Sequence, residues 1–323
     1  MTHITILGSL NYDMVVYTPR VPAGGETIHS DSFETHHGGK GANQALAVRR
    51  LSPRDSIDVA MVGRVGQDGF GRELKAGLGD AGVDVTQVKQ VNGESGVAVI
   101  LVERSGENRI LVHGGANDTF TPEEVNISML TSSGSTLTDY LVIQNELPLP
   151  VVKRAIKLAH ENGVKIAYNP SPMSTQILEW NLFSSIDFLI VNESELSALI
   201  GARIEVSSVT DIDDTILSTI SSLHEKLKFT GTAVVTLGAN GAVYSTPTSS
   251  PRYQSPYIPS SIVDTTGAGD SFLGAFIGAT ASGKTTEEAI KWASAAGCLA
   301  VQKKGAQDSI PFIDEARVLV EGE

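Results

Sequence analysis

The sequence predicts an α/β fold with a parallel-rich central sheet, helices on both faces and a small β-sheet lid. Three observations support this prediction. Short β-branched runs bounded by turn residues recur along the chain, stretches with helical spacing lie between them, and two extended segments interrupt the alternation. Because alternating strands and helices are linked by crossovers, they form a parallel sheet that helices cover on both sides.

The individual elements follow in chain order. The predicted strands are residues 4–7, 59–62, 140–143, 165–168, 188–191 and 233–237. The predicted helices are residues 45–51, 70–78, 151–159, 213–227, 271–279 and 287–301. We expect one domain over residues 1–323, since no linker or internal repeat divides the chain.

The two extended segments are predicted to form the lid. Residues 97–103 and 108–113 are β-rich and flank a Ser-Gly-Glu turn, which indicates a hairpin. Residues 14–33 are also extended. We expect residues 14–37 and 96–113 to leave the main sheet and pair with each other. The exposed edges of such a lid could pair with a second copy, so a homodimer through the lid is expected.

Composition excludes several classes of protein. A formal net charge of -13 argues against a nucleic-acid surface, which needs a basic stripe. The single cysteine fits a reducing compartment. We find neither a signal-peptide pattern nor an apolar run long enough to span a membrane. The sequence therefore predicts a soluble cytoplasmic protein that binds neither nucleic acid nor membrane; nuclear presence stays open for a eukaryotic source.

The most informative motif begins at Asp264 and ends at Asp270, directly before a predicted helix. Gly267 and Gly269 allow backbone N–H groups to converge at a helix N-terminus, which favours an anion. A carboxylate in the same turn would repel a static anion, but it could accept a proton while the N–H groups hold a phosphoryl group. The alternative is a helix N-cap after a glycine turn.

Two further glycine clusters occur near the N-terminus. Residues 38–44 contain Gly-Gly-Lys-Gly-Ala-Asn-Gln before the first predicted helix, and Asn43 and Lys40 can donate to hydroxyls or phosphate. The alternative is a glycine turn that caps the helix. Residues 8–13 follow the first strand, where ligands bind in open α/β sheets. Asn11 and Asp13 would point the same way from an extended segment.

Polar residues also follow several other predicted strands, and strand ends of this kind converge on one crevice. They are Asn145, Glu146, the segment 192–195 and the segment 236–241.

In this order along the chain, the motifs resemble those of the PfkB family of sugar kinases, from Gly8 to Gln307. The resemblance implies a cytoplasmic kinase that uses ATP to phosphorylate a free pentose, D-ribose at its 5-hydroxyl. It implies that Asp270 is the catalytic base, and that an anion hole is formed by Gly267, Ala268 and Gly269.

The resemblance also implies three groups of binding residues. The sugar positions are Asn11, Asp13, Gly39, Lys40, Gly41, Ala42, Asn43, Glu146 and Asp270. The nucleotide positions are Asn192, Glu195, Thr236, Leu237, Gly238, Ala239, Asn240, Gly241, Gly269, Asp270 and Ser294. Asn192 and Glu195 are further tied to Mg²⁺, and family members often carry a larger polar residue than Ser294 against the adenine. The positions of a K⁺ site, mostly backbone carbonyls, are Asp264, Thr266, Ala300, Lys303, Gly305 and Ser309.

Two alternatives remain open at this point. The first is a kinase of the same family that acts on another sugar or a nucleoside; the lid segments contain only Tyr17 and Phe33 as aromatic residues, which favours a free sugar. The second is a nucleotide-sensing protein that has lost catalysis.

One motif is predicted to be a decoy. Residues 278–285 match the P-loop pattern Gly-x-x-x-x-Gly-Lys-Thr. A P-loop must follow a buried strand, whereas the preceding residues have helical spacing. We expect Gly283 to end one helix, and Thr285 with Glu288 to form a capping box for the next.

Overall fold

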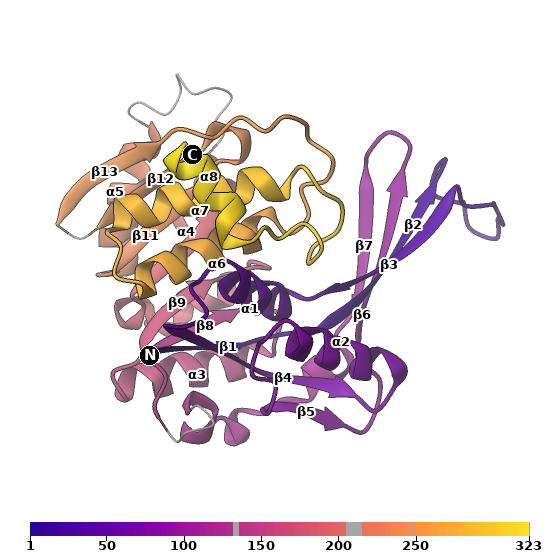
Figure 1. Cartoon of the computed structure of the whole chain (residues 1–323), viewed down its shortest axis with the longest axis horizontal. Coiled ribbons are helices and arrows are strands. Elements are labelled where there is room, and N and C mark those ends of the chain that lie inside the picture. The colour runs from indigo at the N-terminus through magenta and orange to yellow at the C-terminus, as the bar shows by residue number, and fades with distance from the viewer. Residues whose placement is uncertain (132–135, 205–214, 247, 323) are drawn as a thin grey trace.

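The structure is a computed structural model, and it describes residues 1–131, 136–204, 215–246 and 248–322. Within them, the strands form a nine-stranded sheet and a separate four-stranded sheet (Figure 1). The predicted α/β architecture with a second small sheet is confirmed.

The larger sheet is mostly parallel. All neighbours from β11 to β5 pair in parallel, and β12 and β13 add two antiparallel ladders at one edge. In their order across the sheet, the strands are β13 (Ser249–Gln254), β12 (Ala242–Thr246), β11 (Thr232–Thr236), β10 (Phe188–Asn192), β9 (Lys165–Asn169), β8 (Tyr140–Gln144), β1 (Thr2–Leu7), β4 (Ile57–Gly66) and β5 (Val88–Val91).

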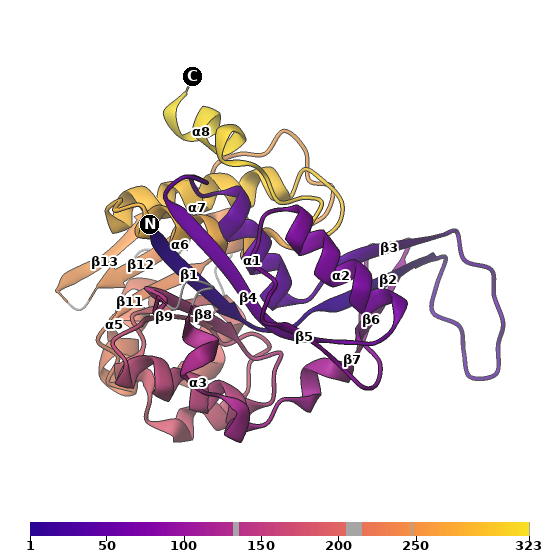
Figure 2. The same ribbon diagram turned by 60° about the horizontal axis from the view of Figure 1, so that its bottom comes forward.

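Helices cover both faces of this sheet (Figure 2). The helices on one face are α1 (Lys40–Arg50), α2 (Gly69–Asp80), α6 (Ala268–Ala281), α7 (Thr286–Ala300) and α8 (Ile313–Glu321). Those on the other face are α3 (Leu149–Glu161), α4 (Glu193–Ile200) and α5 (Thr215–Leu227). Successive strand residues point to opposite faces, so Val142 belongs to one apolar core while Leu141 and Ile143 belong to the other.

The four-stranded sheet contains both predicted lid segments and projects from the main body (Figure 1). Its order is β3 (Ser32–Gly38), β2 (Asn11–Thr18), β6 (Gly96–Glu103) and β7 (Asn108–His113). The predicted hairpin is present, since β6 and β7 pair antiparallel. Strand β2 begins only a few residues after β1 ends. The four-stranded sheet therefore starts at the carboxyl ends of the parallel strands of the nine-stranded sheet.

Some local predictions differ from the structure. Helix α1 begins at Lys40, not at residue 45, because Gly39 takes a φ of 87° as its N-cap and the following residues are already helical. Strands β5 and β12 and helices α4 and α8 were not expected. The first two residues of the predicted helix 213–227 lie outside the described residues.

Cys298, the single cysteine, is buried in α7. No helix in the described ranges combines the length and the apolar character that crossing a bilayer requires.

Candidate functional site

The first turn of α1 is held against the ends of two strands. The backbone N–H of Ala42 donates to the carbonyl of Ser9, just after β1, at 2.9 Å. The carboxylate of Glu146, just after β8, accepts from the N–H of Lys40 at 2.9 Å and from the Ser9 hydroxyl at 2.6 Å. These hydrogen bonds fix the segment Gly39–Asn43 at the carboxyl ends of β1 and β8, where the sequence predicted a site.

The carboxylate of Asp270 lies where the first turns of α1 and α6 meet. Asp270 is only 8% exposed. The side-chain amide of Asn43 donates to its Oδ2 at 3.0 Å, and that of Gln44 donates to its Oδ1 at 2.9 Å. The two glycine motifs singled out in the sequence therefore meet at one carboxylate.

Helix α6 starts with N–H groups that can hold an anion. Gly267 is its N-cap, with a φ of 77° that a residue with a side chain rarely adopts. The N–H of Ala268 donates to the carbonyl of Thr265 at 3.3 Å. The N–H groups of Gly269 and Asp270 have no acceptor within the helix. At the positive end of the helix dipole they provide an anion-binding turn.

Asn11 and Asp13 lie two positions apart on β2, and both are buried. The side-chain amide of Asn117 donates to Oδ1 of Asn11 at 2.8 Å and fixes its orientation. Burial and the negative charges of Glu146 and Asp270 raise the pKa of the Asp13 carboxyl to about 7. Asp13 therefore changes its charge near neutral pH.

Lys40, the first residue of α1, faces three carboxylates. Burial disfavours its charged form, but the negative charges of Asp270, Glu146 and Glu195 outweigh burial and raise the pKa of the ammonium group. Lys40 therefore carries a positive charge at neutral pH, close to the anion-binding turn of α6.

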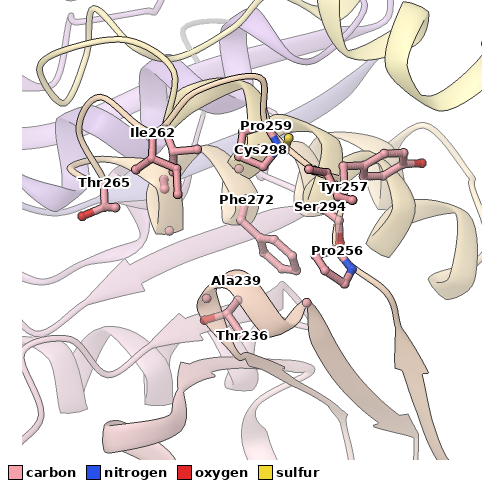
Figure 3. A pocket seen from close by; sticks show the side chains of 17 residues that line it. Thr236, Ala239, Pro256, Tyr257, Pro259, Ile262, Thr265, Phe272, Ser294 and Cys298 are labelled. Carbon is pink, nitrogen blue, oxygen red and sulfur yellow. The ribbon is translucent and has the colours of Figure 1, made fainter. Parts of the chain in front are cut away.

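A cavity of about 510 Å³ lies beside Gly269 (Figure 3). Five residues predicted for the nucleotide site besides Gly269 line it: Thr236, Gly238, Ala239, Gly241 and Ser294. Much of the remaining wall is apolar, with the ring of Phe272 and the segment after β13 on its sides. The Ser294 hydroxyl is buried and has no hydrogen-bond partner in the described part of the chain.

Five of the predicted nucleotide residues do not line this cavity: Asn192, Glu195, Leu237, Asn240 and Asp270. Asn192 and Glu195 form the capping box of α4. The Asn192 side chain accepts from the Glu195 N–H at 2.8 Å, and the Asn192 N–H donates to the Glu195 carboxylate at 3.0 Å. Leu237 is buried, and its N–H donates to the Gly241 carbonyl at 2.8 Å.

The predicted cation residues gather around Asp264. Its carboxylate accepts from the N–H and hydroxyl of Thr266 at 2.9 and 2.7 Å, and from the N–H of Gly305 at 3.0 Å. Burial disfavours the charge, but these hydrogen bonds outweigh it and lower the pKa of Asp264. The Ser309 hydroxyl lies 3.5 Å from the Thr266 carbonyl oxygen. A fixed negative charge and several carbonyls thus lie next to the α6 turn.

The last two predicted cation residues lie at the end of α7. The Ala300 carbonyl accepts from the Lys303 N–H at 3.1 Å, and the Lys303 ammonium binds Glu315 at 2.9 Å. An ammonium has no acceptor, so Lys303 can offer a cation only its backbone carbonyl. Among the described residues, no group of three or more His, Cys, Asp or Glu side chains could hold a metal ion.

A second cavity, of about 350 Å³, separates the four-stranded sheet from the main body. Asp13 lies in its wall together with the aliphatic side chains of Val15, Ile100 and Val102, and its two aromatic rings are those of Tyr17 and His36. This face of the sheet is thus mainly aliphatic, with one carboxylate and two rings.

The P-loop-like motif lies between α6 and α7. The Thr285 hydroxyl accepts from the Glu288 N–H at 3.3 Å, and the Thr285 N–H donates to the Glu288 carboxylate at 2.8 Å. The Lys284 ammonium lies 5.1 Å from the centre of the Trp292 ring. The predicted capping box is confirmed.

The sequence did not indicate all of the buried polar residues of the site. Gln44 and Gln144 are both fully buried at 0% exposure, and Asn117 is 1% exposed. The available signal was a glutamine at the end of the apolar strand β8, where a buried polar side chain requires a partner.

Comparison with known proteins identifies related sequences over the whole chain. Residues 1–313 match the model of the pfkB family of carbohydrate kinases. A ribokinase of Schizosaccharomyces pombe is 38% identical, with 98% of this chain and 96% of the relative aligned. A ribokinase of Haemophilus influenzae is 36% identical, with 98% of each aligned. The structure of Arabidopsis thaliana ribokinase complexed with ribose and ATP superposes with a TM-score of 0.86 at 32% identity, covering 99% of both chains.

Proposed function

The chain belongs to the pfkB family of carbohydrate kinases, and we propose that it transfers the γ-phosphoryl group of ATP to the 5-hydroxyl of D-ribose. The products are ADP and ribose 5-phosphate. The observation that carries the proposal is the position of Asp270, a buried carboxylate between the polar residues of β2 and α1 and the cavity beside Gly269. The ribokinase relatives, one in complex with ribose and ATP, support this choice of substrates.

The sugar is assigned to the side of Asp270 that faces β2 and α1. Oδ1 of Asn43 is buried without a partner in the described chain, so it can accept from a sugar hydroxyl. Asn11, Asp13 and Glu146 add further acceptors, and the backbone of Gly39, Lys40, Gly41 and Ala42 supports the same surface. A site built to hydrogen-bond hydroxyls discriminates against substrates that lack them.

Phosphoryl transfer takes place at the first turn of α6. Asp270 accepts the proton of the 5-hydroxyl while that oxygen attacks the γ-phosphorus in line with the leaving group. The N–H groups of Gly269 and Asp270, with the dipole of α6, stabilise the charge that develops on the transferred group. Lys40 adds a positive charge on the same side. Gly267 and Ala268 shape the turn.

The nucleoside part of ATP is assigned to the cavity of about 510 Å³ (Figure 3). Its apolar walls and the glycine-rich segment Gly238–Gly241 suit a planar base and a ribose. The unpartnered Ser294 hydroxyl can donate to or accept from the base edge.

Two cations fit this site. Mg²⁺ is usually bound by substrate phosphates, water and one or two carboxylates, which agrees with the lack of a three-ligand cluster in the described residues. Glu195, held by Asn192, would hold it near the phosphates, where Mg²⁺ neutralises their charge. K⁺ would be held by the ionised Asp264 and by carbonyls at Thr266, Ala300, Lys303, Gly305 and Ser309. Its charge would stiffen the α6 turn.

We assign residues 14–37 and 96–113, which form the four-stranded sheet, to a lid that covers the sugar. Sugar binding should then slow amide hydrogen exchange in this sheet, and an unchanged rate would contradict a lid. Strand β7 is an edge strand with exposed apolar side chains, so we propose a homodimer through it. We also propose a cytoplasmic location, which fits a single cysteine and which cell fractionation tests.

The proposal is tested by measuring ATP turnover with D-ribose, 2-deoxyribose, hexoses and nucleosides, and by locating the phosphate on the product by NMR. We expect the highest kcat/KM for D-ribose and phosphate on O5. A preference for a nucleoside would favour the family alternative; the aliphatic wall of the second cavity argues against it, since few rings are available for base stacking. Nucleotide binding without turnover of any acceptor would indicate a non-catalytic relative.

A further inference from the structure

Two buried glutamines link the interior of the large sheet to Asp270. Gln144 ends β8, and its side-chain NH₂ donates to the Oε1 of Gln44 at 2.6 Å. The NH₂ of Gln44 in turn donates to Oδ1 of Asp270 at 2.9 Å and to Oδ1 of Asn169 at 3.2 Å. Both glutamines are completely buried. The three side chains therefore form one directed chain of hydrogen bonds from Gln144 to Asp270.

The direction of this chain is determined by chemistry. An ionised carboxylate has only acceptors, so Gln44 must present its NH₂ group to Asp270 and its carbonyl oxygen to Gln144. Gln144 must then use its own NH₂ group as the donor. Its Oε1 is left buried without a hydrogen-bond partner in the described part of the chain. The chain thus leaves one buried acceptor unsatisfied at its far end, whereas an apolar residue at position 144 would leave Oε1 of Gln44 without its donor instead.

We propose that Gln44 is a positioning residue for Asp270, and that Gln144 fixes which end of Gln44 faces it. This inference rests on the proposed role of Asp270 as the base. The Gln44 donor stabilises the ionised carboxylate and, together with Asn43, occupies one position on each oxygen. The remaining lone pairs can then face the sugar hydroxyl. Because Gln44 and Gln144 are both neutral amides, they orient the Asp270 carboxylate without adding a charge to the site.

Other charged groups lie around Asp270. Lys40 on α1 interacts with Asp270, Glu146 and Glu195. Burial and the charges of Glu146 and Asp270 raise the pKa of Asp13 on β2 to about 7. Because Asp13 is assigned to sugar binding, its titration should affect the sugar KM and not kcat at saturating sugar.

The first experiment measures kcat and sugar KM against pH for Gln44→Met and Gln144→Met, which keep length but cannot donate. Loss of a hydrogen bond to a charged group should lower kcat of Gln44→Met about 10–100-fold at neutral pH. The acid limb of the kcat profile should move up by about one pH unit, with sugar KM changed less than about threefold. Gln144→Met should show the same changes to a smaller degree.

The matched control is Gln87→Met. The amide of Gln87 donates to the carbonyls of Ser128 and Thr131, next to the edge strand β5. Its loss should lower thermal stability without moving the kcat profile. If Gln44→Met behaves like Gln87→Met, with lower stability but an unchanged acid limb, its role is only structural and the proposal is wrong.

A second variant tests the direction of the chain. Gln144→Glu has nearly the shape of glutamine, so a packing role predicts that it is milder than Gln144→Met. Where it is ionised, at the alkaline end of the pH profile, a glutamate at this position can only accept, so it would draw the NH₂ of Gln44 away from Asp270. The proposal therefore expects a larger loss of kcat at alkaline pH in Gln144→Glu than in Gln144→Met. The opposite order overturns it, and if Gln144→Glu does not fold, the Gln44→Met comparison decides.

Asp270→Asn is measured in the same series, because it distinguishes a failure of the proposed function from a failure of the inference about Gln44 and Gln144. Full turnover in Asp270→Asn would remove the proposed function and this inference together. A loss of turnover in Asp270→Asn, with wild-type kcat profiles in Gln44→Met and Gln144→Met, would overturn only the inference.

Discussion

The side-chain amide of Asn43 donates a 3.0 Å hydrogen bond to the carboxylate of Asp270, although 227 positions separate the two residues along the chain. The contact exists because the first turns of α1 and α6 meet on one face of the sheet. Oδ1 of Asn43 has no partner among the described residues, so one side chain contacts the base and, in our proposal, also the substrate. Sugar binding and proton transfer are thereby linked through one residue.

Asp13→Asn should make the protein more stable at pH 8. Burial, Glu146 and Asp270 raise the pKa of Asp13 to about 7, so the folded state binds more protons than the unfolded state below that pH. The free energy of unfolding contributed by Asp13 therefore falls as pH rises from the ordinary carboxyl range to about 7. We expect a gain of about 1 kcal/mol or more at pH 8, which disappears near pH 4. Denaturant unfolding of Asp13→Asn and of the wild type at pH 8 and at pH 4 measures this difference in the free energy of unfolding.

The same substitution should weaken sugar binding, since an amide replaces a carboxylate acceptor. Asp55→Asn, at an exposed position, is the control and should change neither property. If Asp13→Asn is less stable than the wild type at pH 8, the ionised Asp13 carboxylate does not destabilise the folded state.

Lys284→Ala should leave turnover and ATP affinity nearly unchanged. Its ammonium lies over the Trp292 ring, and the cavity assigned to ATP lies at Gly269. The matched variant Thr285→Ala removes the helix cap and should cost about 1 kcal/mol of stability. Loss of ATP binding in Lys284→Ala, measured by calorimetry, would place the phosphates at Gly283 and overturn the site assignment.

Replacing Na⁺ or a bulky organic cation by K⁺ at constant ionic strength should raise kcat. The ionised Asp264 and the neighbouring carbonyls would bind an ion whose charge acts on the α6 turn. Asp264→Asn should lose the response because its charge is removed. Equal activity in all three salts would contradict the cation site.

Leu111→Glu should shift the protein from dimer to monomer in sedimentation velocity. Leu111 on the edge strand β7 is 69% exposed, and a charge there would oppose edge pairing. Ile127→Glu, at a partly exposed position outside that sheet, is the control and should leave the dimer intact. A monomeric wild-type protein would disprove the proposed assembly.

The sequence was sufficient for the architecture because its strands and helices have strong local patterns. The runs that became β1, β8 and β10 are apolar and flanked by turn residues, so their type did not depend on distant contacts. Helix α1 was harder, since a glycine is its N-cap and another lies in its first turn, which is stabilised by contacts with Ser9 and Glu146. Tertiary hydrogen bonds decided where that helix begins.

The site was predictable only in part, for a related reason. Asp270 and Asn43 belong to glycine motifs that are recognisable along the chain. Gln144 lies at the end of an apolar strand, and nothing adjacent to it indicates that its partner is Gln44, one hundred positions earlier. The pairing depends on the packing of α1 over β8, which local patterns do not encode.

Turnover of Asp270→Asn tests the central claim most directly. Asparagine keeps the shape of the side chain but cannot take the proton of the sugar hydroxyl, so kcat should fall by about 10²–10⁴-fold. Sugar affinity, measured by calorimetry on the same preparation, should change much less. A variant that retains near-wild-type kcat would contradict the assignment of Asp270 as the base.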